Sequence, residues 1–157
     1  KKDMEQAEEA FNKEDVVKAV ALLRRAAEQN YIPAQVRLGE ILDYAEHDEE
    51  AVGWYMMAAN QDDAAGEYNL GSMYAIGEGI EIDFKKAVYW TNKSAKKDYL
   101  AAVKSLAESY RIGGMGLAVD LEQAQFWEGK AIALEAAIRK MVNKPETKAA
   151  TEKGKTK

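Results

Sequence analysis

Residues 65–80 read AGEYNLGSMYAIGEGI, and much of this order returns further along the chain. The recurring types include leucine, tyrosine, glycine and tryptophan in one fixed order, so chance does not account for the match. Self-similarity at a fixed period predicts a repeat protein in which each repeat is one structural unit. At a shift of 36 residues Leu70, Tyr74 and Gly77 fall on Leu106, Tyr110 and Gly113, and at a shift of 37 Gly79, Asp83, Ala87 and Trp90 fall on Gly116, Asp120, Ala124 and Trp127.

Two further copies lie upstream and have shorter loops. Leu38-Gly39 precedes Leu70-Gly71 by 32 residues, and Glu46-His47-Asp48 stands where the later copies have a glycine-rich turn. The first copy is the most degenerate, and only its second half is recognisable. That half matches the next copy at a shift of 32 residues. Ala19, Leu22, Ala26 and Ala27 correspond to Ala51, Trp54, Ala58 and Ala59.

Each unit is predicted to consist of two helices, because small and apolar residues recur three and four positions apart. The turn Gly77-Glu78-Gly79 admits positive φ angles and ends the first helix. Asp83 or Asp120 then stands where an N-cap carboxylate begins the second helix. Within the first helix, Gly39 and Gly71 are expected where a neighbouring helix approaches closely. We expect helices over residues 3–12, 16–29, 34–45, 49–60, 65–76, 84–97, 101–112 and 121–142.

A single helix pair cannot bury its own apolar face, so neighbouring pairs must stack. The expected fold is all-α, a right-handed α/α solenoid of about four stacked helix pairs plus a C-terminal capping helix. Residues 1–143 would form this domain, whereas residues 144–157 hold five lysines and two glutamates and are predicted to be disordered. The cap is predicted from the apolar residues that prolong the last helix, namely Leu134, Ala137, Ile138, Met141 and Val142.

Residues 65–90 resemble the Sel-one-like repeat, a relative of the tetratricopeptide repeat. The next copy departs from the family pattern at Ala107, where glycine is preferred, and the copy before has Leu42 where tyrosine is usual. The resemblance covers about residues 5–135 and is strongest in the second half. It implies a scaffold or adaptor role, commonly in bacterial proteins and in protein-quality-control complexes, without naming a partner.

The resemblance also implies where a partner would bind, because the first helix of each pair lines the concave face of tetratricopeptide-like stacks. With Leu38, Leu70 and Leu106 as buried references, residues two before, two after, five after and six after them project toward that groove. Their mixture of aromatic, aliphatic and charged groups is typical of an interface. The predicted partner-binding residues are Glu40, Asp43, Tyr44, Tyr68, Ser72, Ile76, Lys104, Glu108, Arg111 and Ile112.

The leading hypothesis is therefore a scaffold whose concave groove binds another protein or a peptide. Lys104 and Arg111 would donate hydrogen bonds to carboxylates or a chain terminus, while Tyr44 and Tyr68 would supply rigid contact area. Tyr68 also has a structural interpretation, since the family often has an aromatic residue there. One alternative is a structural subunit or assembly factor that uses convex or terminal surfaces, with the lysine-rich tail as a tether. An enzyme of unrecognised type is a third.

Composition and motifs argue against several other classes of function. The net charge of -5 disfavours nucleic-acid binding, the lack of cysteine excludes thiolate chemistry, and no apolar run approaches the roughly 20 residues of a membrane helix. His47 is the only histidine and falls at a helix start, so neither a metal nor a cofactor is expected. The glycine turns lack the strand and lysine of a phosphate loop, and paired carboxylates such as Asp62-Asp63 fit solvated surface, so no catalytic residue is predicted.

Trp54, Trp90 and Trp127 recur at the repeat spacing and are predicted to pack in the core rather than to bind a ligand. The chain opens at Lys1-Lys2-Asp3 without a methionine or a signal-peptide pattern, which indicates either a removed leader or a fragment. The compartment and the oligomeric state stay open, with a slight preference for an exported bacterial protein.

Overall fold

The computed structural model describes residues 1–143, which form a solenoid of four helix pairs and contain no strand. The predicted helices are confirmed to within two residues at either end, whereas the short 3-10 turn η1 (Gly114–Gly116) was not predicted. The predicted tail, residues 144–157, lies outside the described residues. The helices are α1 (Lys2–Asn12), α2 (Val16–Glu28), α3 (Ile32–Tyr44), α4 (Asp48–Asn60), α5 (Ala64–Ile76), α6 (Phe84–Ala95), α7 (Leu100–Ile112) and α8 (Leu121–Val142).

Helix ends follow the predicted capping chemistry. The Asp83 side chain accepts a hydrogen bond from the backbone N–H of Lys86 at 3.0 Å, and Asp120 accepts from Gln123 at the same distance. Each carboxylate satisfies an N–H group that would otherwise have no partner in the first helical turn. At the other end, Gly77 and Gly113 adopt left-handed backbone with φ 80° and end α5 and α7.

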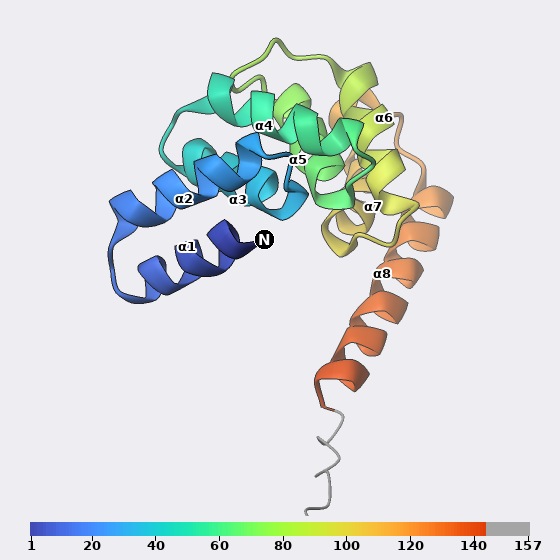
Figure 1. Cartoon of the computed structure of the whole chain (residues 1–157). Coiled ribbons are helices and arrows are strands. Elements are labelled where there is room, and N and C mark those ends of the chain that lie inside the picture. The colour runs from blue at the N-terminus through green and yellow to red at the C-terminus, as the bar shows by residue number, and fades with distance from the viewer. Residues whose placement is uncertain (144–157) are drawn as a thin grey trace, which may run out of the picture.

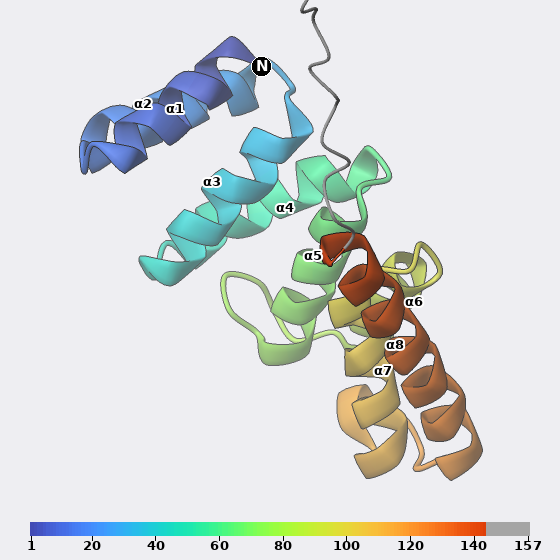
Figure 2. The same cartoon turned by 90° about the horizontal axis from the view of Figure 1, so that it is seen from below.

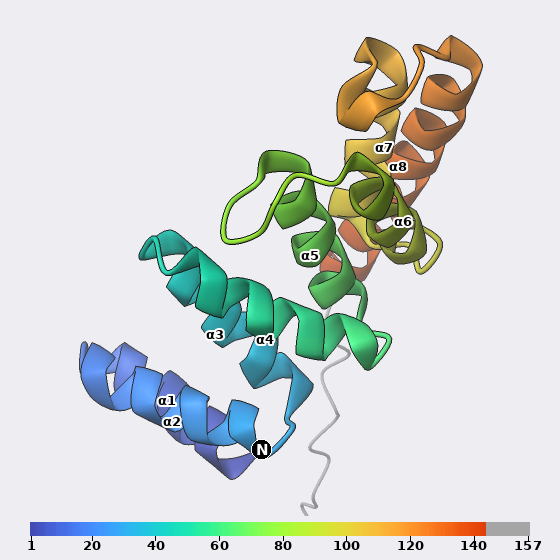
Figure 3. The same ribbon diagram turned by 90° about the horizontal axis from the view of Figure 1, so that it is seen from above.

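The stack is built mainly from contacts between helices that follow one another in sequence. The ribbon forms an arch with α1 and α2 at one end and the C-terminal half of α8 at the other (Figure 1). Seen from below, α1, α3, α5 and α7 lie on the inner side of the arch (Figure 2), whereas α2, α4 and α6 face the viewer from above (Figure 3). We call these the concave and convex faces.

Glycines mark the places where neighbouring elements approach most closely. A Cβ atom on Gly39 would lie 2.5 Å from the ring of Tyr55, and one on Gly71 would lie 2.8 Å from the hydroxyl of Thr91. Both glycines therefore have the role that the sequence predicted, since each lets the second helix of a pair pack against the first. Gly79, with φ 66°, brings the turn before α6 against the backbone of Asp48 in the preceding unit.

The core consists of leucines and many alanines, with aromatic rings filling the wider gaps between helices. Leu38, Leu70 and Leu106 are fully buried, as expected of the reference positions. Trp127 is buried in the cluster formed around α7 and α8, while Trp54 and Trp90 are half-buried against the larger cluster of the preceding helices. The packing role predicted for the tryptophans is therefore confirmed.

The C-terminal cap differs from the prediction. Helix α8 is 22 residues long and extends past its neighbour α7, so only Leu134 of the predicted cap residues packs on the core. Ile138, Met141 and Val142 are exposed, the last two at 77%. Apolar spacing correctly predicted a longer helix, but it could not show that the last turns of α8 extend beyond the helices that pack against it.

Candidate functional site

The predicted binding residues occupy matching register positions on successive first helices, which lie on the concave side of the arch. Position two before the reference leucine holds Tyr68 and Lys104, and position two after holds Glu40, Ser72 and Glu108. Five and six residues after it come the pairs Asp43 and Tyr44 on α3, and Arg111 and Ile112 on α7, while α5 contributes Ile76.

The last residues of three first helices form the most exposed apolar row of this face. Tyr44 is 94% exposed, Ile76 57% and Ile112 60%. We call these three residues the apolar stripe. Large apolar side chains that share one register, and that no element of residues 1–143 covers, are typical of an interaction surface.

Tyr68 lies deeper in the groove and contacts the next unit. Its ring is 5.6 Å from that of Tyr99, which precedes α7, and the two planes are tilted by 46°. Burial raises the pKa of Tyr99, and the nearby Glu40 and Asp63 carboxylates raise it further. Tyr68 thus has a structural role between units, and its half-buried ring still borders the groove.

The cations predicted to hold a partner's carboxylate are engaged within the chain. Arg111 forms an ion pair with Glu108, and Lys104 forms one with Glu135 of α8. Arg37 pairs with Glu40 at 3.1 Å. A partner carboxylate would therefore have to displace an internal one, which lowers the gain from binding there.

Unlike the charged side chains just described, Asp43 has no ion-pair partner among residues 1–143. Its carboxylate accepts a hydrogen bond from the hydroxyl of Tyr55 at 3.4 Å, and the Tyr55 ring is buried. Burial raises the pKa of Asp43, the Tyr55 hydrogen bond opposes that rise, and the like charge of Asp48 adds to it. The structure thus holds an anionic acceptor in place beside the apolar stripe.

Helix α1 also contributes to the concave face, which the predicted binding residues did not include. The contributing residues precede their counterparts on α3 by 32 positions, which is the period of the repeat. They are Met4, Glu8, Phe11 and Asn12, and the counterparts are Val36, Glu40, Asp43 and Tyr44. Only the second half of the first copy is recognisable by sequence, so the similarity itself does not point to α1. These residues line a hollow of about 510 Å³ formed by Met4, Ala7, Glu8, Phe11, Asn12, Leu23 and Arg37.

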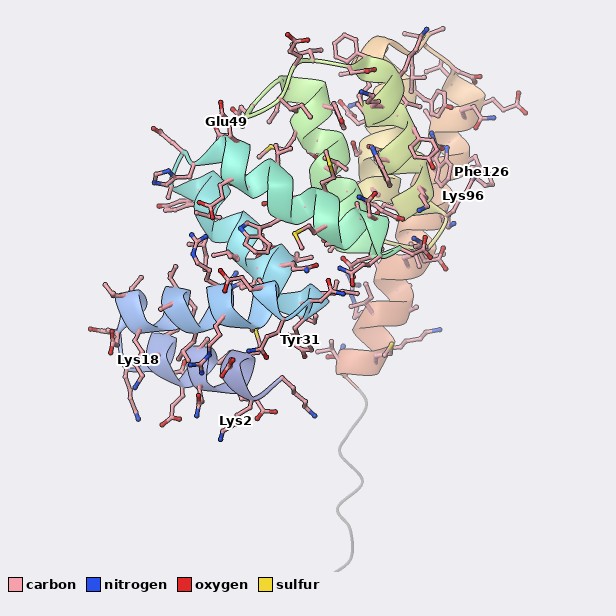
Figure 4. All side chains as sticks on the ribbon, turned by 45° about the horizontal axis from the view of Figure 1, so that its top comes forward. Lys2, Lys18, Tyr31, Glu49, Lys96 and Phe126 are labelled. Atoms are coloured by element: carbon pink, nitrogen blue, oxygen red, sulfur yellow. The ribbon has the colours of Figure 1, made fainter. Side chains whose placement is uncertain are left out.

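The convex face carries a second set of exposed aromatic residues. Tyr89 and Phe126 occupy matching positions on α6 and α8, 37 residues apart, and each is more than half exposed. Each ring meets the tryptophan that follows it edge-on, at 5.0 Å for Tyr89 and 5.2 Å for Phe126. Phe126 and Lys96 both point outward at the end of the molecule that holds α6 and α8 (Figure 4).

Two further features bear on other kinds of site. His47 is the N-cap residue of α4, and residues 1–143 contain no group of histidine and acidic side chains arranged to hold a metal ion. In the same part of the chain no helix combines the length and apolar character needed to cross a bilayer.

Comparison with known proteins agrees with the repeat pattern. The sequence profile of the Sel1 repeat matches residues 13–31, 32–63 and 64–99. The crystal structure of a Sel1 repeat protein from Oxalobacter formigenes superposes with a TM-score of 0.74 at 29% identity, covering 83% of this chain and 57% of that one. The structure of c5321, a protective antigen of uropathogenic Escherichia coli, gives 0.74 at 30% identity, covering 83% and 30%.

Curated relatives are much longer than this chain. An uncharacterized protein of Neisseria meningitidis serogroup B is 33% identical over 119 residues, which are 76% of this chain and 25% of the relative. Chitin synthase regulatory factor 3 of Schizosaccharomyces pombe is 31% identical over 68% of this chain and 12% of its own length. The chain therefore spans a quarter or less of these two relatives.

Proposed function

Because this chain belongs to the Sel1 repeat family, whose non-catalytic solenoids serve as protein-interaction scaffolds, we propose that its concave face binds a partner protein or peptide. The apolar stripe of Tyr44, Ile76 and Ile112 carries the proposal. Three exposed apolar side chains at one register offer repeated anchor points to a single extended or helical segment.

Two other features support the concave face as the binding site. The rows of the groove combine apolar, aromatic and charged groups, as interfaces do, and the hollow beside α1 adds a recess at one end. Helices α3, α5 and α7 each pack between two second helices, so a partner would meet a surface already in its binding conformation.

The test compares two variants that each remove exposed apolar area from one face. The concave variant carries Tyr44→Ser, Ile76→Ser and Ile112→Ser, and the convex control carries Tyr89→Ser and Phe126→Ser. Affinity capture from a lysate of the source cells, read by mass spectrometry, should recover a partner with wild type and the convex control but lose it with the concave variant. Equal recovery by the concave variant and wild type would overturn the proposal.

The exposed aromatic residues of the convex face favour a second candidate, a structural subunit that assembles through α6 and α8. Tyr89 and Phe126 are held at fixed orientations by their tryptophan neighbours, so they could contact a flat partner surface at little cost in side-chain entropy. In the same capture experiment, loss of the partner in the convex variant alone would establish this candidate in place of the first.

A further inference from the structure

We infer that the segment recognised by the concave face is cationic and carries a large apolar side chain, and that it binds against α1 and α3. This inference rests on the proposed function and specifies the chemistry of its partner. It differs from the expectation from sequence, in which Lys104 and Arg111 bind a carboxylate of the partner.

The charges of the groove support a cationic partner. The three cations on the concave rows and their flanks, Arg37, Lys104 and Arg111, each pair with a glutamate of the same chain. Two carboxylates of the same rows, Glu8 and Asp43, have no ion-pair partner among residues 1–143. After internal pairing, the uncompensated charge of the groove is negative and lies in its N-terminal half.

Asp43 is the better placed of these two carboxylates. The buried phenol of Tyr55 donates a hydrogen bond to it at 3.4 Å, which fixes its position before any partner arrives. A charge-assisted hydrogen bond from a lysine or arginine would satisfy the remaining acceptor capacity of the carboxylate. The neighbouring Tyr44 ring, almost wholly exposed, can pack on the aliphatic stem of such a side chain.

The hollow beside α1 supplies the apolar half of the recognition. Met4, Phe11 and Leu23 contribute its apolar wall, and Phe11 occupies on α1 the register that Asp43 occupies on α3. Its volume of about 510 Å³ exceeds the roughly 150 Å³ that suffices for a benzene molecule. A leucine, methionine or aromatic side chain next to the partner's cation can therefore enter it.

Long-range charge acts in the same direction. The chain has a net charge of -5. Residues 144–157 contribute five lysines and two glutamates, a charge of +3, so residues 1–143 carry a net charge of -8. A field of this sign raises the rate at which a cationic segment meets the surface and lowers that rate for an acidic one.

The experiment titrates isotope-labelled full-length protein with synthetic peptides and follows the amide resonances. The first peptide alternates lysine and leucine, the second replaces lysine by glutamate, and the third replaces leucine by serine. We expect the lysine–leucine peptide to bind, with shifts centred on Met4, Phe11 and Asp43, and the other two to bind at least about tenfold more weakly.

Matched variants assign the effect to the groove. Asp43→Asn removes the charge but can still accept from Tyr55, so we expect a loss of affinity of about tenfold for the lysine–leucine peptide. Glu49→Gln makes the same change in charge on α4, away from the concave rows, and should leave the affinity within about twofold. Glu8→Gln provides a second test, because this exposed side chain makes no hydrogen bond within residues 1–143 that folding could need.

Three results would overturn the inference. They are equal or tighter binding of the glutamate peptide, unchanged affinity in both Asp43→Asn and Glu8→Gln, and failure of the lysine–leucine peptide to bind. The proposed function fails separately, when the variant of the apolar stripe retains its captured partner. A partner that is lost with the stripe variant but binds Asp43→Asn and Glu8→Gln with unchanged affinity would refute the cationic chemistry and leave the concave site standing.

Discussion

The Nζ atom of Lys97 lies 2.6 Å from Oε1 of Glu67, a carboxylate with no solvent exposure. The repeat places the same two positions together in each of the last three units. In the α3–α4 unit they hold Gln35 and Gln61, which share a hydrogen bond of 2.9 Å, and in the α7–α8 unit they hold Val103 and Leu134, which join one apolar cluster. The same pair of positions is thus occupied by two amides in the first of these units, by an ion pair in the second and by two apolar side chains in the third.

This matching leads to a prediction about Glu67. Its carboxylate also contacts Lys93 at 3.0 Å, so Glu67→Gln leaves both lysines with only the exposed Asp62 as counter-ion. Breaking a buried ion pair costs several kcal/mol, and because each lysine is about a third exposed we expect a loss near 2 kcal/mol in the free energy of unfolding. Urea denaturation followed by circular dichroism measures it.

The double variant Glu67→Gln/Lys97→Gln tests whether the two positions act as a pair. It recreates the amide chemistry of Gln35 and Gln61, so it should be more stable than Glu67→Gln alone by about 1 kcal/mol. Strictly additive effects of the two substitutions would contradict the pairing.

Two glycines in helices should respond oppositely to the same substitution. Gly39→Ala places a methyl group 2.5 Å from the Tyr55 ring and should destabilise the protein by about 1–3 kcal/mol. Gly53→Ala, on α4, places it in open space and should stabilise by up to about 1 kcal/mol through helix propensity. Thermal unfolding of both variants checks the sign, and a stabilised Gly39→Ala would refute the close approach.

Stability should also fall in acid through Asp62. Hydrogen bonds from Lys97 and Lys93 lower the pKa of Asp62 to about 2, below its ordinary value of 3.8. Because the folded value is the lower one, the contribution of Asp62 is present above about pH 4 and is lost as the pH falls toward 2. The urea midpoint of Asp62→Asn should therefore approach that of wild type between pH 5 and pH 2, and a constant difference would contradict the assignment.

The end of α8 should contribute little to stability. Met141→Ser and Val142→Ser alter side chains that are 77% exposed, so each should change the free energy of unfolding by no more than about 0.5 kcal/mol. Leu134→Ser removes a side chain that packs on the core, and it should cost clearly more. Equal losses at positions 134 and 141 would show that the last turns do act as a cap.

The repeat made most of this fold predictable, since uncommon residues at a fixed period determine both the helices and their register. Gly39 and Gly71 were correctly placed at close approaches, because a glycine next to the buried reference leucine leaves room for a neighbouring helix. The site was less predictable. The register correctly indicated that Tyr44 and Ile112 are exposed. It could not show that Lys104 pairs with Glu135, because that contact depends on how α8 packs against α7, whereas the Glu108–Arg111 pair follows from their spacing of three residues on one helix.

The most direct measurement places a photo-crosslinking benzoylphenylalanine at position 44 on the concave face or at position 89 on the convex face, and irradiates the source cells. Both positions hold exposed tyrosines, so neither replacement disturbs the core. Binding in the concave groove predicts a cross-linked partner from position 44 and none from position 89. Cross-linking from position 89 alone would contradict it and transfer the interaction to the convex face.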